Sequence, residues 1–282
     1  MYIALREFTY SETISMNTIF RHVLITRFNV IGWGTVDKYR NTTRDEEWLK
    51  HRFELFKQYC LPSVQNQSCS DFKWYVFFDS KTPAKYREMI AHINDDMKMF
   101  IPVFVPPITH QKLDLYYSEL LTHMPEIIRP DCDFLISTRL DNDDIIHTDF
   151  IRTVQENFQR THKHVINMRY GYKLDLRNNK LYQSKQYSNP FTSFIEKKPF
   201  KLPFLTQKCF KTVLHTTHGS LKNKYRVNQI TDKRYWVQAL HERNLVNDVK
   251  PQRKAIKIDK LATNGGFAFL EILETVLNSV SK

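Results

Sequence analysis

A chain of 282 residues, of which 41% are hydrophobic and 13% aromatic, can bury a substantial core, which excludes an intrinsically disordered protein. Only six glycines occur, and neither a P-loop nor a dinucleotide-binding fingerprint is present. Any bound phosphate therefore depends on a cation, on Lys and Arg, or on helix N-termini. The net charge of +12 is dispersed along the chain and favours an anionic substrate or an anionic membrane surface over a specific nucleic acid.

Strand-like and helix-like segments alternate after an irregular segment over residues 1–20. In chain order, the pattern predicts a strand at 22–28, a helix at 45–59, a short helical turn from 62, a strand at 72–78, a helix at 83–93, a strand at 100–105, a helix at 113–123, a strand that ends in acidic residues after 139, a helix at 148–159 and a strand at 164–170. This βαβα order predicts an α/β fold with a Rossmann-type mixed, mostly parallel sheet flanked by helices.

The regular alternation ends near residue 170. Beyond it the sequence predicts short strands at 180–183 and 191–195, and helices at 233–243 and 267–279. We interpret residues 21–170 as an α/β lobe that binds the ligand, and residues 171–282 as a less regular lobe that packs on it.

Three acidic residues, Asp141, Asp143 and Asp144, follow a strand-like apolar run within four positions. In an open α/β sheet, ligands bind just beyond the carboxyl ends of the strands. Capping of the next helix accounts for one acid, but three crowded carboxylates repel and raise one another's pKa. A bound divalent cation relieves that repulsion, so the cluster predicts a metal site with oxygen ligands.

The sequence resembles a family of bacterial rhamnosyltransferases. The likeness lies in the segments HVLITRF (22–28), YCLPSVQNQ (59–67), WYVFFD (74–79), STRLDNDD (137–144), which is similar to the family's Arg-x-Asp-x-Asp-Asp signature, and HTTHGS (215–220). The resemblance implies a glycosyltransferase of the GT-A fold that uses a nucleoside diphosphate sugar and Mn²⁺ or Mg²⁺. It implies transfer of a sugar such as rhamnose to a glycan or lipid-linked acceptor in surface polysaccharide synthesis, with the first lobe holding the donor and the second holding the acceptor and completing the metal site.

Sugar transfer leaves two negative charges on the departing diphosphate, and a metal that bridges its oxygens stabilises them. We assign Asp143 as a direct metal ligand and Asp141 as a metal or ribose partner. Asp144 is a supporting acid that holds sugar hydroxyls or water ligands. Arg139 lies on the same side of its strand as Asp141 and either reaches the donor or orients that carboxylate.

The resemblance also implies that a histidine from the C-terminal part of the chain completes the metal site. We assign His218 to this role, since imidazole suits manganese better than magnesium. A turn histidine that bonds to the backbone is the alternative, and His215 is a second candidate.

Further donor contacts are predicted where other strands end. Thr26, Arg27 and Asp79 stand at such positions, where GT-A enzymes hold the nucleotide. A strand-terminal Arg suits a diphosphate, whereas Asp79 has an alternative role in a turn or helix cap before Pro83.

The catalytic base is the least defined part of the predicted site. Inversion at the anomeric carbon needs a carboxylate within hydrogen-bond reach of the acceptor hydroxyl. Glu196 and Asp232 are the candidates after residue 170, and a surface charge is the alternative for both.

Two other classes of function stay open. A nucleotidyl or phosphoryl transferase would use the same acids but ordinarily needs a Gly-rich phosphate loop, which is missing. A non-enzymatic polyanion-binding protein would account for the positive charge, with the acids structural. The four cysteines lack zinc-type spacing, and no secretory signal or run of 18 apolar residues occurs, so we expect a cytoplasmic protein, at most peripheral to the inner face of the membrane.

Overall fold

The computed structural model describes residues 18–30, 45–108, 113–125, 132–198, 210–242, 255–256 and 266–267. The strands are β1 (Thr18–Arg27), β2 (Lys73–Asp79), β3 (Phe100–Val105), β4 (Cys132–Arg139), β5 (Ile145–Ile146), β6 (His164–Asp175), β7 (Lys180–Lys185), β8 (Ser193–Lys197), β9 (Arg226–Leu240) and β10 (Ala255–Ile256). The helical segments are α1 (Glu46–Leu55), η1 (Phe56–Cys60), α2 (Leu61–Gln65), α3 (Ala84–Asp96), α4 (Leu113–Leu121), α6 (Phe150–Glu156), η2 (Val213–His215) and α7 (His218–Lys224).

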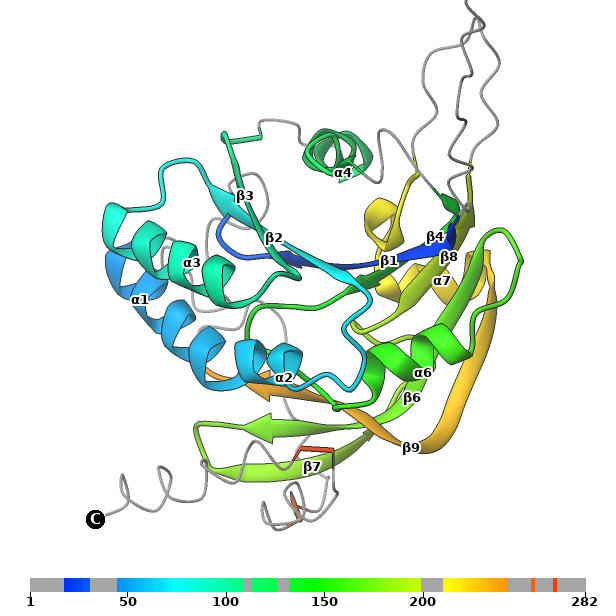
Figure 1. Ribbon diagram of the computed structural model, residues 1–282. Coiled ribbons are helices and arrows are strands. Elements are labelled where there is room, and N and C mark those ends of the chain that lie inside the picture. The colour runs from blue at the N-terminus through cyan, green and yellow to red at the C-terminus, as the bar shows by residue number, and fades with distance from the viewer. Residues whose placement is uncertain are drawn as a thin grey trace, which may run out of the picture.

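One mixed sheet organises the described residues, in the order β10-β7-β6-β8-β4-β1-β2-β3 (Figure 1). Strands β3, β2, β1 and β4 are parallel neighbours, whereas β8, β6 and β7 continue the sheet with antiparallel pairing. β9 runs parallel to β6 and antiparallel to β5. These features confirm the predicted α/β fold with a mixed, mostly parallel sheet flanked by helices.

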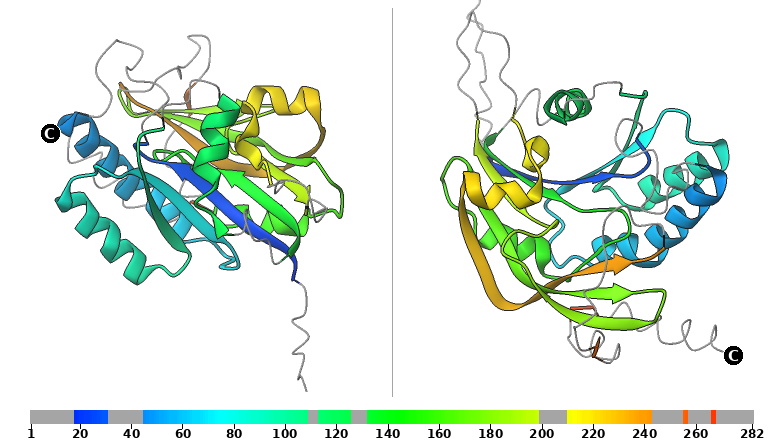
Figure 2. Two further views of the ribbon diagram at one scale, coloured as in Figure 1. Left: turned by 90° about the horizontal axis from the view of Figure 1, so that it is seen from above. Right: turned by 180° about the vertical axis from the view of Figure 1, so that it is seen from behind.

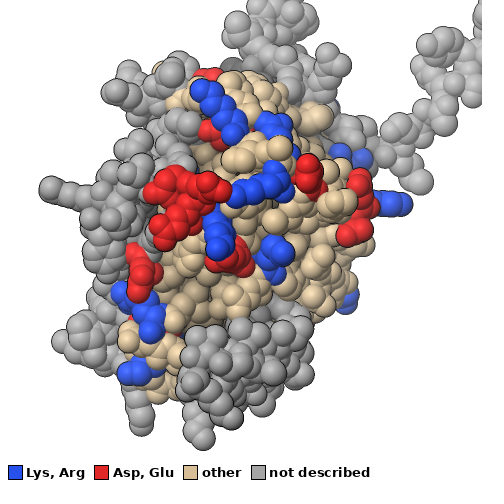
Figure 3. All heavy atoms as spheres, turned by 90° about the vertical axis from the view of Figure 1, so that its left-hand side faces the viewer, with Lys and Arg blue, Asp and Glu red and all other residues tan. Residues whose placement is uncertain are grey.

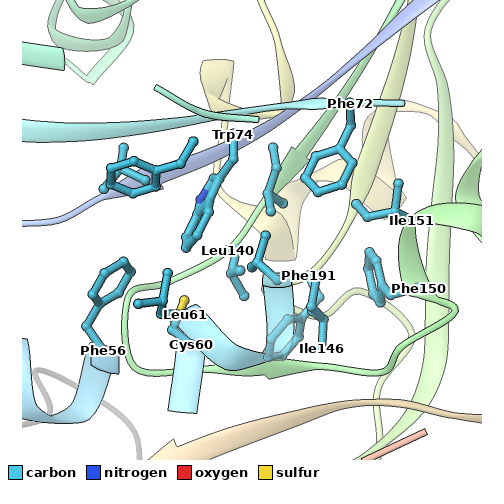
Figure 4. Close-up of a cluster of buried hydrophobic side chains, with 14 of the residues drawn as sticks. Phe56, Cys60, Leu61, Phe72, Trp74, Leu140, Ile146, Phe150, Ile151 and Phe191 are labelled. Carbon is cyan, nitrogen blue, oxygen red and sulfur yellow. The ribbon is translucent and has the colours of Figure 1, made fainter. Parts of the chain in front are cut away.

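The two faces of the parallel strands are buried by different helices. On one face, α1, α2, α3 and α6 cover the largest apolar cluster, which includes Trp74, Leu140 and Phe150 (Figure 4). On the other face, α4, η2 and α7 cover a second cluster, and α7 is best seen from behind (Figure 2). The sheet curls, so that β6, β7 and β9 lie below α2 and α6 in the view of Figure 1.

Alternation along β1 and β4 decides which side chains reach which face. In β1, Leu24 packs in the first cluster and Ile25 in the second; in β4, Ile136 belongs to the first and Leu135 to the second. Leu140 follows β4 and is fully buried in the first cluster, a burial that stabilises by about 1.5–3 kcal/mol. The turn after β4 is therefore anchored at its first residue.

The helices begin and end as local signals dictate. Asp45 caps α1 by accepting the Trp48 N–H at 2.7 Å, and Glu46 and Glu47 suit the positive end of the helix. The helix then passes through one π-helical turn, η1, into α2. Pro83 directly precedes α3, as predicted from its fixed φ.

The predicted helix at 233–243 is wrong, because residues up to Leu240 belong to β9. Residues 235–240 are all buried, including Gln238, so side chains on both faces of the strand are buried and apolar and polar residues do not alternate. Such a run has no period that separates strand from helix. The predicted helix at 267–279 and most of the predicted segment 1–20 lie outside the described residues, although β1 already begins at Thr18.

The lobe boundary predicted at residue 170 falls within β6. Strands on either side of that position share the sheet, through pairing of β8 with β4 and of β7 with β6. Among the described helices, none is long and apolar enough to cross a membrane.

Candidate functional site

The strand order of the sheet reverses between β1 and β4. The chain passes from β1 to β2 and β3 on one side and then returns to β4 on the other side of β1. Ligands of open α/β sheets bind outside the carboxyl ends of the strands at such a switch point. The Leu140 N–H donates to the Ile25 carbonyl at 3.0 Å, so the acidic turn starts at this point, as predicted.

Four polar residues gather at this switch point, on the face covered by α4. The Arg27 guanidinium carbon lies 5.3 Å from the centroid of the Tyr117 ring. Arg139 donates to both carboxylate oxygens of Asp141, at 3.1–3.2 Å, and these two side chains are 19% and 30% exposed. Burial alone lowers the pKa of Arg139, but the Asp141 and Tyr117 oxygens outweigh it and raise that pKa above its ordinary value.

His218, at the start of α7, joins this group. Burial lowers the pKa of its imidazole, the Arg139 charge lowers it further, and the Asp141 carboxylate opposes both. These influences place His218 within electrostatic reach of both residues and keep it neutral at pH 7, the form that binds metals. We call Arg27, Tyr117, Arg139, Asp141 and His218 the switch-point cluster.

The second histidine candidate has other partners. His215 contacts the Thr212 carbonyl through Nδ1 at 2.6 Å and the Tyr225 hydroxyl through Nε2 at 2.8 Å. Burial lowers the pKa of His215 as well. Both ring nitrogens therefore serve to pack η2 against the end of α7.

Asp143 lies on the opposite side of the turn, in a buried ion pair. Its Oδ2 atom accepts from Arg52 Nη1 at 2.9 Å and lies 2.9 Å from His241 Nε2. Burial would raise the pKa of Asp143, but the Arg52 charge and the bond to His241 hold it well below its usual range. The Arg52 and Asp143 side chains are only 13% and 6% exposed, so the predicted metal ligand is already paired within the protein.

Asp144 and Cys60 form hydrogen bonds that anchor the acidic turn to neighbouring elements. Asp144 accepts the Ala239 N–H at 2.9 Å and is 2% exposed. Burial and the charges of Asp143 and Asp141 raise its pKa well above the usual value. The Cys60 thiol, from the π-helical turn, donates to the Asp141 carbonyl at 3.6 Å. Asp144 thus ties the acidic turn to β9, and its role toward sugar hydroxyls or water ligands stays a prediction.

Two of the predicted donor contacts have other roles in the structure. Thr26 is fully buried, and its hydroxyl accepts from the Trp74 indole N–H at 2.9 Å. Asp79 is 6% exposed and accepts the Lys81 N–H at 2.7 Å, the turn role described above as the alternative. Of the residues predicted at the ends of β1 and β2, only Arg27 belongs to the switch-point cluster.

The two base candidates lie on different elements from the cluster. Glu196, in β8, is buried and accepts the N–H groups of Lys211 and Thr212 at 3.3 and 2.7 Å. Asp232, in β9, accepts from the Tyr235 hydroxyl at 2.8 Å and lines a polar cleft of about 650 Å³ between α6 and β9. Their roles as bases stay predictions.

Among the described residues, Asp141 and His218 are the candidate ligands for a divalent ion. Nowhere among them do three His, Cys, Asp or Glu side chains converge as a metal centre does. The Asp141 carboxylate and the His218 imidazole lie within electrostatic reach of each other, whereas Asp143 is paired with Arg52 and His241. Metal ions at nucleotide phosphates are commonly held by one or two protein groups, the phosphate oxygens and water. Asp141 and His218 fit that set.

Sequence reasoning missed Arg52, His241 and Tyr117. They lie in α1, just after β9 and in α4, far from the acidic turn along the chain, and no local motif marks them. Tertiary contacts alone identify them.

A family model described as "Putative rhamnosyl transferase" matches residues 21–253. No curated protein matches the chain. The N-terminal fragment 1–349 of Staphylococcus aureus TarS is similar at 12% identity and a TM-score of 0.42, covering 79% of this chain and 60% of that one. The same fragment in complex with UDP gives 10% identity, a TM-score of 0.40 and coverages of 79% and 61%, so this chain spans less than two thirds of these TarS chains.

Proposed function

The chain belongs to the rhamnosyltransferase family of glycosyltransferases, and from this premise we propose that it transfers rhamnose from a nucleoside diphosphate to a glycan hydroxyl. The observation that carries the proposal is the switch-point cluster, where two arginines, one partly exposed carboxylate and a neutral histidine meet beyond β1 and β4.

The arginines suit the leaving diphosphate. Guanidinium groups bind phosphate oxygens in pairs and stay charged at any physiological pH. Arg27 and Arg139 both lie on the α4 face of neighbouring strand ends, so one diphosphate could contact both. A divalent ion held by Asp141 and His218 would add positive charge to the same leaving group.

For Asp143 the geometry supports a positioning role. Its buried contacts with Arg52 and His241 tie the acidic turn to α1 and to the end of β9. The turn then presents Asp141 toward the α4 face. Its assignment as a direct metal ligand stays a prediction and requires displacement of Arg52.

For the acceptor side we propose a glycan of the cell surface, built on the membrane or on a lipid carrier. Asp232 is exposed and lines a polar cleft, whereas Glu196 is buried and accepts the N–H groups of Lys211 and Thr212. Of the two base candidates, Asp232 is therefore the one that solvent and an acceptor can reach. Peripheral attachment to an anionic membrane surface stays a prediction from the net charge.

The alternatives gain less support. A nucleotidyl or phosphoryl transferase would need a phosphate-binding loop that the six glycines do not form. For a polyanion-binding protein we would expect cations gathered on one face. On the face formed by α1 and α3, Lys and Arg are instead interspersed with Asp and Glu (Figure 3), as in the pairs Lys50–Glu54 and Lys85–Glu46.

A donor screen tests the proposal. UDP-, GDP- and dTDP-sugars, including dTDP-rhamnose, would be incubated with the protein and Mn²⁺ or Mg²⁺, and release of the nucleoside diphosphate measured. We expect slow hydrolysis of one donor class, lost in Asp141→Asn. Release of pyrophosphate from a nucleoside triphosphate, with every nucleotide sugar left intact, would instead indicate a nucleotidyltransferase.

A further inference from the structure

A compact group of cations and tyrosines lies on β6, β7 and β9, beside the switch-point cluster. Its members are Arg169, Tyr170, Lys185, Tyr187 and Arg234, which we call the basic–aromatic surface. Tyr170 of β6 pairs with Lys185 of β7 and with Arg234 of β9, so the three form one row across the sheet. Tyr187, just after β7, is 53% exposed.

The cations stack on the tyrosine rings. The guanidinium carbon of Arg169 lies 4.0 Å from the Tyr187 centroid, and Lys185 Nζ lies 6.0 Å from the centroids of both Tyr170 and Tyr187. Arg234 stands 5.7 Å from the Tyr170 centroid. Such stacking orients a cation but leaves its charge in place.

None of these three cations forms a salt bridge with any residue that the structure describes. A structural role accounts for Arg234, which donates to the Gly171 and Ser184 carbonyls. It does not account for Lys185, which is exposed, or for Arg169, whose side chain bonds, among the described residues, to the Tyr187 hydroxyl alone. The part of the chain that the structure describes therefore supplies no carboxylate that neutralises these cations.

The connection from β7 to β8 joins this surface to the switch-point cluster. The Ser188 hydroxyl, next to Tyr187, donates to the His218 carbonyl, and the Thr192 carbonyl accepts the Arg139 N–H at 3.4 Å. The connection is held rigidly, since Asn189 bonds to Asn167 at 3.0 Å and to the Met168 carbonyl at 2.5 Å. A molecule bound at Tyr187 would therefore lie close to the proposed donor site, because the neighbouring residue Ser188 contacts His218.

We infer that the basic–aromatic surface binds the acceptor and that this acceptor is a negatively charged glycan. Tyrosine rings offer an apolar face to a sugar ring and a polar edge to water. Unpaired Arg and Lys side chains supply complementary charge for carboxylate or phosphate groups along the chain of sugars. The inference rests on the proposed function, because only sugar transfer requires an acceptor beside the donor.

Direct binding of defined oligosaccharides tests the inference. The probes are fluorescently labelled oligogalacturonate, which carries carboxylates, a glycerol phosphate oligomer, which carries phosphates, and neutral dextran of matched length. We expect one anionic probe to bind and dextran to bind at least about tenfold more weakly, equivalent to about 1.4 kcal/mol. Binding should weaken as salt rises, because the attraction is between charges.

Variants locate the binding. The double variant Arg169→Gln/Lys185→Gln should lose at least about tenfold in affinity for the anionic probe, whereas Lys222→Gln, an exposed lysine of α7, serves as the matched control and should bind as the wild type does. Tyr187→Ala should weaken binding of the glycan probe. If a single-stranded DNA oligomer or anionic vesicles bind to the wild-type protein, the same substitution should leave that binding unchanged. Equal binding of dextran, an unaffected double variant, or DNA or vesicles bound through the same residues would overturn the inference.

Donor hydrolysis without acceptor separates this outcome from failure of the proposed function. Hydrolysis should be unchanged in the double variant, since its residues lie outside the switch-point cluster. If the wild-type protein hydrolyses no nucleotide sugar, the proposed function fails. The binding measurements would still show whether the basic–aromatic surface binds an anionic glycan.

Discussion

The two sides of the acidic turn place chemically identical carboxylates in opposite environments. Asp141 is 30% exposed, bonds to Arg139 and lies within electrostatic reach of His218. Asp143, two residues later, is 6% exposed and is held by Arg52 and His241. One carboxylate faces the switch point of the sheet, and the other faces the layer between α1 and β9.

The difference shows why spacing alone does not identify a ligand. In an extended turn, residues two apart share a side only while the backbone stays regular. Here the Asp144 N–H bonds back to the Asp141 carbonyl at 3.2 Å, so the turn curls and the two carboxylates diverge. Arg52 then neutralises the inward one. The outward carboxylate stays partly exposed.

Removal of Arg52 should give the largest effect. Arg52→Ala leaves Asp143 buried beside His241 without its main countercharge, which costs about 3–5 kcal/mol of the free energy of unfolding. Urea unfolding would measure it, with Lys50→Ala on the exposed side of the same helix as control, where little change is expected. The double variant Arg52→Met/Asp143→Leu should recover much of the loss. Equal stability of Arg52→Ala and Lys50→Ala would mean that the pair contributes nothing.

Asp141→Asn should separate activity from stability. We expect the rate of sugar transfer to fall about 10²- to 10³-fold, with the urea midpoint almost unchanged because the side chain is partly exposed. For Asp143→Asn we expect the opposite result, in which the main effect is a large loss of stability. If Asp143→Asn is as stable as the wild type yet inactive, the result supports a direct-ligand role for Asp143. It would contradict a purely structural role for its buried ion pair.

Asp144→Asn should stabilise the protein at neutral pH. Burial and two neighbouring charges raise the folded-state pKa of Asp144, so the folded protein holds a proton that the unfolded chain releases, and stability falls as pH rises above about 4. Asparagine keeps an acceptor for the Ala239 N–H without the charge. We expect a gain on the order of 1–2 kcal/mol at pH 7 that vanishes below pH 4. A gain independent of pH would contradict this cause.

The smallest effect concerns the pKa of His218, measured by NMR titration of the metal-free protein. Burial and Arg139 lower this pKa and Asp141 raises it. Arg139→Gln should therefore raise it and Asp141→Asn should lower it. Asp143→Asn should leave it unchanged, because Asp143 lies on the other side of the turn. Equal shifts in Asp141→Asn and Asp143→Asn would show that the two carboxylates share one site.

The sequence by itself predicted the α/β class, the strands and helices from residue 22 to residue 170 other than β5, and the position of the acidic turn at a strand end. These predictions depend on local patterns, namely apolar periodicity, capping residues and Pro83. The helix predicted at 233–243 failed, because a strand buried on both faces has no such pattern and β9 is fixed by pairing with β5 and β6.

Only the tertiary structure decided which acid is partly exposed and which is buried. Arg52, Asn142 and His241 meet around Asp143 although they are separated by up to 189 residues along the chain, and no local rule records that meeting. The same holds for Arg27 and His218, which join Arg139 and Asp141 because strand order places the ends of β1 and β4 together. Local sequence determines which side chains are available, whereas long-range packing determines their charge state and exposure.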